Sequence, residues 1–311
     1  MGKTAFVFVG QGSQYVGMGK DIVNEFESAS KVFDSASKVL GYDMKKLVFE
    51  GPEEQLKITE NTQPAILTAS YAMLQPLIEA GVKADFTAGL SLGEYTANVY
   101  AKTITFEDAV KIVRLRGKYM QEEVPAGVGG MTAVIGLEDE VVVKACNDVK
   151  EFGYVACANF NCPGQVVVSG ELKALEKVGE LLKTLGAKRV IPLAVSAPFH
   201  CRLLINAGEK LKSQFDKTSF NEPIIPVVAN TTGLPYNNVN DISKLLVEQV
   251  SQTVKWTNSI KYMMAQGVDT FVEIGPGKTL SGLIKKTDRS VKIYNIQDIA
   301  SLNKTLEGLG V

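Results

Sequence analysis

The hydrophobic positions near the start of the chain form a continuous run, from Ala5 to Val9. This run predicts a strand at 4–9 that is buried on both faces of a parallel sheet, and a glycine-rich turn follows it. Thr105 and Asp108 stand three residues apart, which resembles a capping box at the start of a helix. The first part of the chain is expected to hold helices at 21–40, 64–80, 91–100 and 105–122, and a short strand at 85–90.

The middle of the chain alternates more quickly between short strands and helices. Strands are expected at 130–137, 154–160, 165–169 and 188–193, with helices at 138–149 and 171–185. This β-α-β-β-α-β order is that of a ferredoxin-like unit. The elements expected after it are a strand at 225–229, helices at 242–250 and 256–266, and a strand at 270–274.

These elements predict an α/β fold in two parts. A large α/β domain with a parallel sheet core is expected from 1–127 and 197–311, where strands alternate with helices. A small ferredoxin-like subdomain at 128–196 is expected to interrupt it.

Composition and charge narrow the function classes. With 311 residues, of which 45% are hydrophobic and 22% charged, the chain can bury a substantial core. Its 33 basic and 34 acidic residues leave a net charge of −1, which argues against a nucleic-acid binder. No uncharged apolar stretch reaches the length of a membrane span, and no secretory signal pattern opens the chain. We therefore expect a cytoplasmic protein.

The cysteines give no sign of a metal site. They contain no CxxC pair, and the chain has a single histidine, so a structural zinc site is not expected. Reduced thiols are the expectation for a cytoplasmic protein, and here they are Cys146, Cys157, Cys162 and Cys201.

The sharpest local motif is Gly89-Leu90-Ser91-Leu92-Gly93, a GxSxG between a predicted strand and a predicted helix. In that setting a tight turn exposes the serine hydroxyl, and small flanking residues permit the strained backbone. The N–H of Leu92, at the start of the helix, can then point at a developing oxyanion. The alternative is a serine that only caps the helix.

A nucleophilic serine needs a base, and His200 is the only histidine in the chain. It lies in a turn-rich segment just after the last strand of the predicted insert, which favours a general base over a buried structural histidine. No aspartate or glutamate stands out as a third member. A main-chain carbonyl could orient the imidazole instead.

Arg116 breaks the apolar face of the helix predicted at 105–122. The other basic residues, Lys111, Arg114 and Lys118, share the opposite face. A buried guanidinium needs an anion, and its fork suits a carboxylate. Arg116 could therefore bind a substrate carboxylate, form an internal salt bridge, or extend its charged end to the surface.

Seven segments, in this order and spacing, make the chain similar to a known family. With them, nearly the whole chain resembles the malonyl-CoA:acyl-carrier-protein transacylases of bacterial fatty acid synthesis. The resemblance implies an α/β-hydrolase-like body with a ferredoxin-like insert, in agreement with the elements above. The segments are Phe8-Val9-Gly10-Gln11-Gly12-Ser13-Gln14, Thr62-Gln63-Pro64-Ala65, Gly89-Leu90-Ser91-Leu92-Gly93-Glu94-Tyr95, Arg116-Gly117-Lys118-Tyr119-Met120-Gln121, Asn159-Phe160-Asn161-Cys162-Pro163-Gly164-Gln165, Phe199-His200 and Glu273-Ile274-Gly275-Pro276-Gly277.

The resemblance also implies catalytic roles. Ser91 is expected to be acylated, with His200 as its base. Gln11 and the Leu92 N–H would form the oxyanion hole. The main-chain carbonyl of Gln249 would orient the histidine, which would explain the missing acid.

For the substrate, the resemblance implies that Arg116 pairs with the malonyl carboxylate and that Phe199 crowds an α-methyl group. The chain departs from the family at Leu90, where a histidine is usual. That histidine is not the family's base, so the mechanism is unaffected, while the polarity beside Ser91 changes. The full set of expected substrate-binding residues is Arg116, Phe199, Gln63 and Asn161.

The expected reaction is a ping-pong transfer of malonyl from malonyl-CoA to the phosphopantetheine thiol of an acyl carrier protein, in fatty acid synthesis. It needs no metal or redox cofactor. The expected partners are the carrier protein and the coenzyme A thioester, with no nucleic acid or membrane, and the enzyme is expected to be a monomer. The alternatives are a trans-acting polyketide acyltransferase, an acyl-thioester hydrolase on the same site, and a non-catalytic module that binds carrier protein.

Carrier proteins are typically acidic, so docking on a chain of near-zero net charge calls for a local basic patch. Two pairs are candidates, Lys188-Arg189 and Lys285-Lys286. The alternative for each pair is solvated surface with no role in docking.

Overall fold

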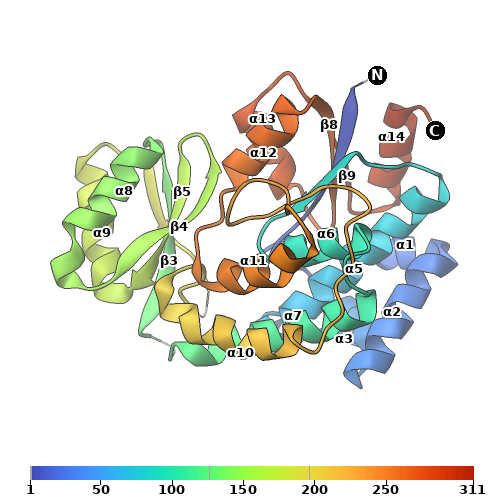
Figure 1. Cartoon of the computed structure of the whole chain (residues 1–311), viewed down its shortest axis with the longest axis horizontal. Helices are drawn as coiled ribbons and strands as arrows, with labels where there is room; N and C mark the ends of the chain where they lie inside the picture. The colour runs from blue at the N-terminus through green and yellow to red at the C-terminus, as the bar shows by residue number, and fades with distance from the viewer. Residues whose placement is uncertain (1, 126, 196) are drawn as a thin grey trace.

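Two β-sheets organise the chain, and they belong to two lobes (Figure 1). The computed structural model describes residues 2–125, 127–195 and 197–311. In the larger lobe the strands lie in the order β7-β2-β1-β8-β9, and each neighbouring pair is parallel. The strands are β1 (Lys3–Phe8), β2 (Phe86–Gly89), β7 (Val227–Val228), β8 (Val268–Ile274) and β9 (Lys292–Ile296).

The central strand β1 explains why the first apolar run is unbroken. It pairs with β2 on one side and β8 on the other, and Ala5 to Phe8 are fully buried. A strand in this position is covered on both faces, so polar residues have no place along it. The predicted strand at 4–9 is confirmed with a shift of one residue.

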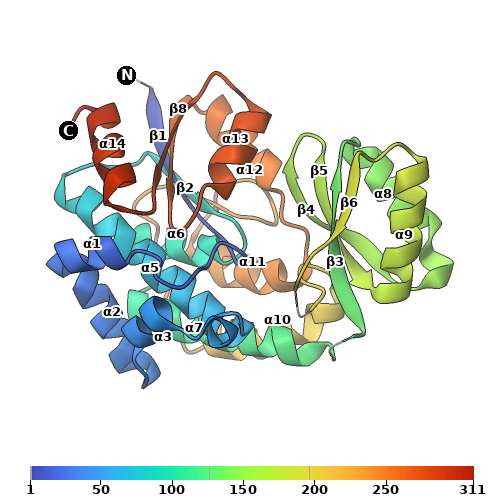
Figure 2. The ribbon, with the colours of Figure 1, turned by 180° about the vertical axis from the view of Figure 1, so that it is seen from behind.

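Helices cover the parallel sheet on both faces (Figures 1 and 2). The long α5 packs against α7 and α2, and α6 packs against β1 and β2. The helices are α1 (Lys20–Glu25), α2 (Glu27–Leu40), α3 (Met44–Glu50), α4 (Glu53–Leu56), α5 (Thr59–Glu79), α6 (Gly93–Tyr100), α7 (Phe106–Glu123), α10 (Ile205–Phe215), α11 (Val239–Ser251), α12 (Trp256–Ala265), α13 (Thr279–Thr287) and α14 (Ile299–Leu309), with a 3₁₀ turn at Arg202–Leu204.

The smaller lobe has an antiparallel sheet in the order β4-β5-β3-β6. Its two helices pack on this sheet around a separate apolar core that includes Val142, Val168 and Val178. The predicted β-α-β-β-α-β order is found. The elements are β3 (Gly129–Ile135), α8 (Asp139–Asp148), a 3₁₀ turn (Lys150–Phe152), β4 (Val155–Cys162), β5 (Gln165–Glu171), α9 (Leu172–Thr184) and β6 (Arg189–Pro192).

The lobes meet where α12 and α13 pack against β4, and Val254 forms an isolated bridge with Asn159. Subdomain limits at 127/128 and 196/197 stay a prediction, and Ser196 itself lies outside the described residues. No helix in the described ranges is long and apolar enough to span a membrane.

Several predicted elements differ in extent from those in the structure. The helix expected at 21–40 is two helices, because Phe26 between them has an extended backbone. The helix expected at 64–80 begins at Thr59, so Pro64 lies inside α5 and not at its start. The start of α7 is as predicted, since the Thr105 side chain accepts from the Asp108 N–H.

Candidate active site

Ser91 lies in a sharp turn between β2 and α6, with a left-handed backbone at φ 52°. The flanking glycines are required by space, because a Cβ on Gly89 would overlap the backbone of Gly93, and one on Gly93 would overlap Phe8. Asn230 secures the turn, since its Oδ1 accepts from the Ser91 N–H at 2.6 Å and its Nδ2 donates to Gly89 O at 2.7 Å. This is the geometry of a nucleophile elbow.

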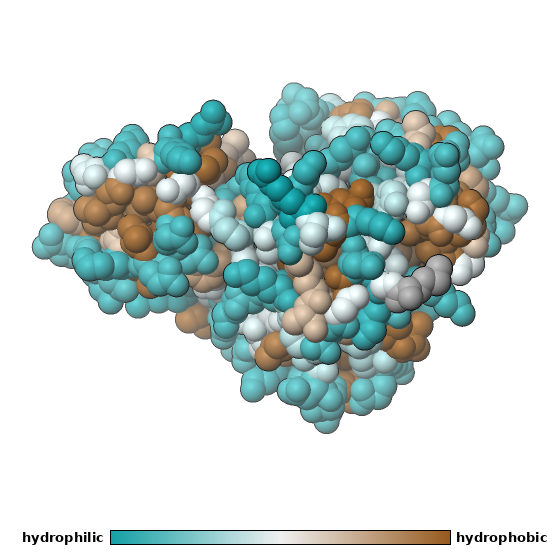
Figure 3. Space-filling view, turned by 90° about the horizontal axis from the view of Figure 1, so that it is seen from above, coloured by the Kyte–Doolittle hydropathy of each residue, from teal (hydrophilic) through white to brown (hydrophobic). Residues whose placement is uncertain are grey.

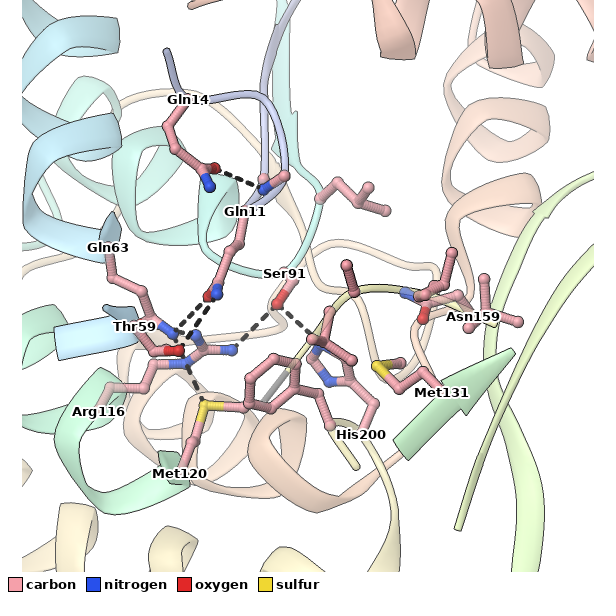
Figure 4. A pocket seen from close by; sticks show the side chains of 18 of the residues that line it. Gln11, Gln14, Thr59, Gln63, Ser91, Arg116, Met120, Met131, Asn159 and His200 are labelled. Atoms are coloured by element: carbon pink, nitrogen blue, oxygen red, sulfur yellow. Dashed lines mark hydrogen bonds between the residues drawn. The ribbon is translucent and has the colours of Figure 1, made fainter. Parts of the chain in front are cut away.

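His200 meets the hydroxyl of Ser91. The distance from Ser91 Oγ to His200 Nε2 is 2.7 Å (Figure 4). The distance from His200 Nδ1 to the main-chain oxygen of Gln249 is also 2.7 Å. A carbonyl only accepts, so Nδ1 carries the proton and Nε2 is left to accept from Ser91. The structure therefore places a carbonyl where a serine triad has its carboxylate.

The imidazole is kept neutral. Burial lowers the pKa of His200 to about 3, and the nearby positive charge of Arg116 adds to the effect. At physiological pH the imidazole is therefore neutral, and its Nε2 has a free lone pair that can accept the proton of Ser91.

Arg116, from α7, is buried and reaches the same hydroxyl from the other side (Figure 4). Its Nη2 lies 3.1 Å from Ser91 Oγ and 3.0 Å from Gln249 Oε1, and its Nη1 donates to Gln63 Oε1 at 2.8 Å. Within the described residues no carboxylate forms a salt bridge with it. Burial lowers the pKa of Arg116. Of the three possibilities left open by the sequence, a direct ion pair among the described residues and an exposed charged end are therefore excluded.

The predicted oxyanion residues border the elbow. Gln11 follows β1, and the adjoining Gly10 packs so closely that a Cβ there would lie 2.6 Å from Leu90 O. The side chain of Gln11 accepts from Gln63 Nε2 at 3.3 Å. Leu92 caps the N-terminus of α6, so its N–H belongs to the positive end of that helix.

A cleft of about 600 Å³ opens above these groups. Both lobes line it, and the notch between the lobes is visible in the space-filling view (Figure 3). The predicted residues Gln63, Phe199 and Asn161 all lie on its wall, and so does Leu90. The other lining residues are Gly10, Gln11, Gly12, Gln14, Lys57, Thr59, Ser91, Arg116, Met120, Met131, Asn159, Val167, Leu193, Ala194, Val195 and His200.

A family model described as acyl transferase domain matches residues 5–307. The chain belongs to the acyl transferase family. The malonyl CoA-acyl carrier protein transacylase of Bacillus subtilis is 45% identical over 310 residues, covering 99% of this chain and 98% of the relative.

Solved structures of this acyl transferase family give the same result. A malonyl CoA-acyl carrier protein transacylase from Clostridium perfringens has a TM-score of 0.97 and 48% identity, covering 99% of this chain and 97% of the other. A type II PKS acyl-carrier protein in complex with its malonyl-transacylase gives a TM-score of 0.96 at 44% identity, covering 98% and 99% of the two chains.

Sequence reasoning missed a group of buried polar residues beneath the acyl transferase site. Glu94, Asn98 and Tyr236 are connected to Gln249 and Asn230 by hydrogen bonds. Burial raises the pKa of Glu94 to about 7, although hydrogen bonds from Tyr236, Gln249 and Asn230 oppose the rise. The available signal was Glu94 itself, which follows the GxSxG motif directly and is the only charged residue of α6.

Proposed function

We propose that the chain is an acyl-carrier-protein S-malonyltransferase that works through a malonyl ester of Ser91. The observation that carries this proposal is the buried guanidinium of Arg116, 3.1 Å from Ser91 Oγ and without a carboxylate partner among the described residues. An acyl group attached to Ser91 places its far end beside that cation. Malonyl ends in a carboxylate that a guanidinium fork can bind.

In the first half-reaction the Ser91 proton passes to His200 Nε2 while Oγ attacks the thioester carbonyl of malonyl-CoA. The Leu92 N–H and Gln11 hold the oxyanion of the tetrahedral intermediate. The carbon–sulfur bond then breaks, coenzyme A leaves with the proton from His200, and malonyl-Ser91 remains.

The second half-reaction reverses these roles. The phosphopantetheine thiol of the carrier protein gives its proton to His200, and the sulfur attacks the malonyl ester. The ester bond breaks, and Ser91 Oγ takes the proton back from His200. Each step moves protons and an acyl group only, so no metal or redox cofactor is required.

Gln249 supports this chemistry through its main chain. Its carbonyl accepts from His200 Nδ1 and so fixes the tautomer, as a carboxylate does in a serine triad. Because a carbonyl carries no full charge, it stabilises the imidazolium less than a carboxylate would. The imidazolium therefore gives its proton readily to the leaving thiolate.

Substrate binding is assigned to both lobes. Gln63 holds Arg116 through Nη1, whereas Phe199 lines the space around the acyl carbon. Asn161 Oδ1 is buried and makes no hydrogen bond within the described residues, which suits an N–H donor on the pantetheine arm. All these groups come from one chain, so we propose a monomer, acting in the cytoplasm in fatty acid synthesis.

The test is covalent labelling with radioactive malonyl-CoA. The wild type should take up one malonyl group per chain, and peptide mapping should find it on Ser91. Added carrier protein should discharge the label at least a hundredfold faster than water does. Faster loss to water would support the thioester hydrolase, and no label would support the non-catalytic module.

A further inference from the structure

Glu94 is a fully buried carboxylate that lies outside the catalytic steps above. Its Oε2 accepts from Gln249 Nε2 at 2.7 Å and from the Asn230 N–H at 3.0 Å, and its Oε1 accepts from the Tyr236 hydroxyl at 2.6 Å. Within the described ranges it forms no salt bridge. An ionised group without a direct counter-ion is costly to bury, so its position calls for a reason.

One of its partners, Gln249, contacts the whole catalytic set. Its side-chain oxygen accepts from Arg116, its side-chain nitrogen donates to Ser91 O at 2.9 Å, and its main-chain oxygen accepts from His200. The same nitrogen donates to Glu94. The amide thus lies between a buried cation on its oxygen side and a buried carboxylate on its nitrogen side, which fixes its orientation.

A second partner, Asn230, leads back to the elbow. Its main-chain N–H donates to Glu94, while its side chain holds the N–H of Ser91 and the carbonyl of Gly89. Glu94 is therefore connected to Ser91 by two separate routes, each through one residue.

We propose that Glu94 is a positioning residue, which holds Gln249 and Asn230 against the Ser91 elbow and supplies the counter-charge of Arg116 across the Gln249 amide. This inference rests on the proposed malonyl transfer. Burial raises the pKa of Glu94 to about 7, so above that pH the substrate-free site holds one buried cation and one buried anion with an amide between them. Bound malonyl adds a second anion to the same cation, so Glu94 opposes malonyl binding and leaves a neutral acyl group unaffected.

The test is single-turnover acylation of the wild type and Glu94→Gln, with malonyl-CoA and with acetyl-CoA, at a pH of about 8.5 where Glu94 of the wild type is ionised. Glutamine keeps the shape, its oxygen can accept from Gln249 and Asn230, and its amide can donate to the Tyr236 oxygen. The acylation rate at saturation should fall about tenfold with both thioesters, because charged hydrogen bonds become neutral ones. The half-saturating concentration should fall about threefold or more for malonyl-CoA and stay unchanged for acetyl-CoA.

Two further variants separate charge from position. Glu94→Asp keeps the charge but moves the carboxylate oxygens away from Gln249 and Asn230. The acylation rates with malonyl-CoA and with acetyl-CoA should therefore both fall. The ratio of the two half-saturating concentrations should stay at the wild-type value. Tyr236→Phe removes the hydrogen bond on the side away from Gln249, and should lower the melting temperature without changing that ratio.

An unchanged ratio in Glu94→Gln overturns the counter-charge role, and wild-type acylation rates in Glu94→Asp overturn the positioning role. If Glu94→Gln does not fold, Glu94→Asp still tests positioning. Failure of the proposed function is distinct, because the wild type itself would then form no malonyl-Ser91.

Discussion

The two walls of the cleft are built in different ways. On the wall from the parallel-sheet lobe, Ser91, His200 and Arg116 are linked by hydrogen bonds of 2.7 to 3.1 Å. On the wall from the antiparallel sheet, Met131 and Val167 present apolar surface, and Asn159 and Asn161 add two uncharged amides. We infer that bonds are made and broken on the first wall, and that the second shapes the space for the thioester arm.

The difference shows what each sheet contributes. The ends of parallel strands converge at one edge, so the turns after β1 and β2 bring Gln11 and Ser91 together although they are far apart in sequence. A strand of an antiparallel sheet presents alternate side chains to the cleft along its length, which builds a surface and not a point of convergence.

The largest expected effect is the loss of activity on substitution of Ser91 or His200. Ser91→Ala should abolish malonyl labelling, and His200→Ala should lower turnover about 10⁴-fold, as in other catalytic units. No second histidine exists to replace it. Both are measured by transfer of labelled malonyl to carrier protein. Lys31→Ala, at an exposed position of α2, is the control that should keep the wild-type rate. A His200→Ala enzyme within tenfold of wild type would falsify the assignment of the base.

The next effect concerns acyl selectivity. Arg116→Ala should cost malonyl transfer about 1.5–3 kcal/mol, the scale of a hydrogen bond to a charged group, and acetyl transfer less. The measurement is kcat/KM for both thioesters. Equal losses with malonyl and acetyl would mean that Arg116 only supports the fold of the catalytic wall.

A third effect is a pH dependence of stability that comes from His200. Its pKa is about 3 in the folded protein, through burial and then the charge of Arg116, and about 6.5 when unfolded. Between these values the unfolded chain binds a proton that the folded protein does not, so the free energy of unfolding falls as the pH falls. The loss approaches about 1.4 kcal/mol per pH unit.

Urea unfolding of the wild type and His200→Ala at pH 7 and pH 5 isolates this contribution. The stability of the wild type relative to the variant should fall by about 2 kcal/mol over that range. A difference that stays constant with pH would show that the imidazole takes up its proton equally in both states.

The sequence was most informative where a local rule dictates the geometry. GxSxG between a strand and a helix predicts the elbow, and the only histidine of the chain predicts the base. Arg116 is different, because periodicity places it on a buried face without naming its partner. Only the fold brings it to Ser91, 25 residues away along the chain.

The hydrogen bonds within the polar group beneath the site could not be predicted from the sequence, although Glu94 alone stands out on α6. Glu94 and Gln249 lie 155 residues apart, and their contact depends on α6 and α11 packing under the same turn. The role of the Gln249 main chain leaves no trace in residue type, since any residue has a carbonyl. The family resemblance could assign it, whereas physical reasoning from spacing could not.

The smallest expected effect concerns carrier-protein docking, where the basic pairs Lys188-Arg189 and Lys285-Lys286 are all exposed. Both pairs lie at the same end of the antiparallel sheet. At this end Ile135 of β3 pairs with Arg189 of β6 on one side and with Gln165 of β5 on the other. Lys286 joins them there, since its Nζ lies 3.1 Å from Gln165 Oε1. Leu193, which follows β6 directly, lines the cleft. At about 3.3 Å per residue, Arg189 lies roughly 13 Å from Leu193 along the strand. Only the body of the carrier protein would reach these lysines, while its arm enters the cleft.

Reversing the charge of Lys285 and Lys286 should therefore raise the KM for carrier protein only about three- to tenfold at low salt, the scale of exposed charge pairs. The rate of acylation by malonyl-CoA should not change. The control Lys31→Glu, on α2, should change neither that rate nor the KM for carrier protein. Physiological salt should bring the wild type towards the variant, since exposed charges are screened within about 8–10 Å. A KM for carrier protein that responds neither to the reversal nor to salt would show that carrier protein docks elsewhere, without the help of these basic residues.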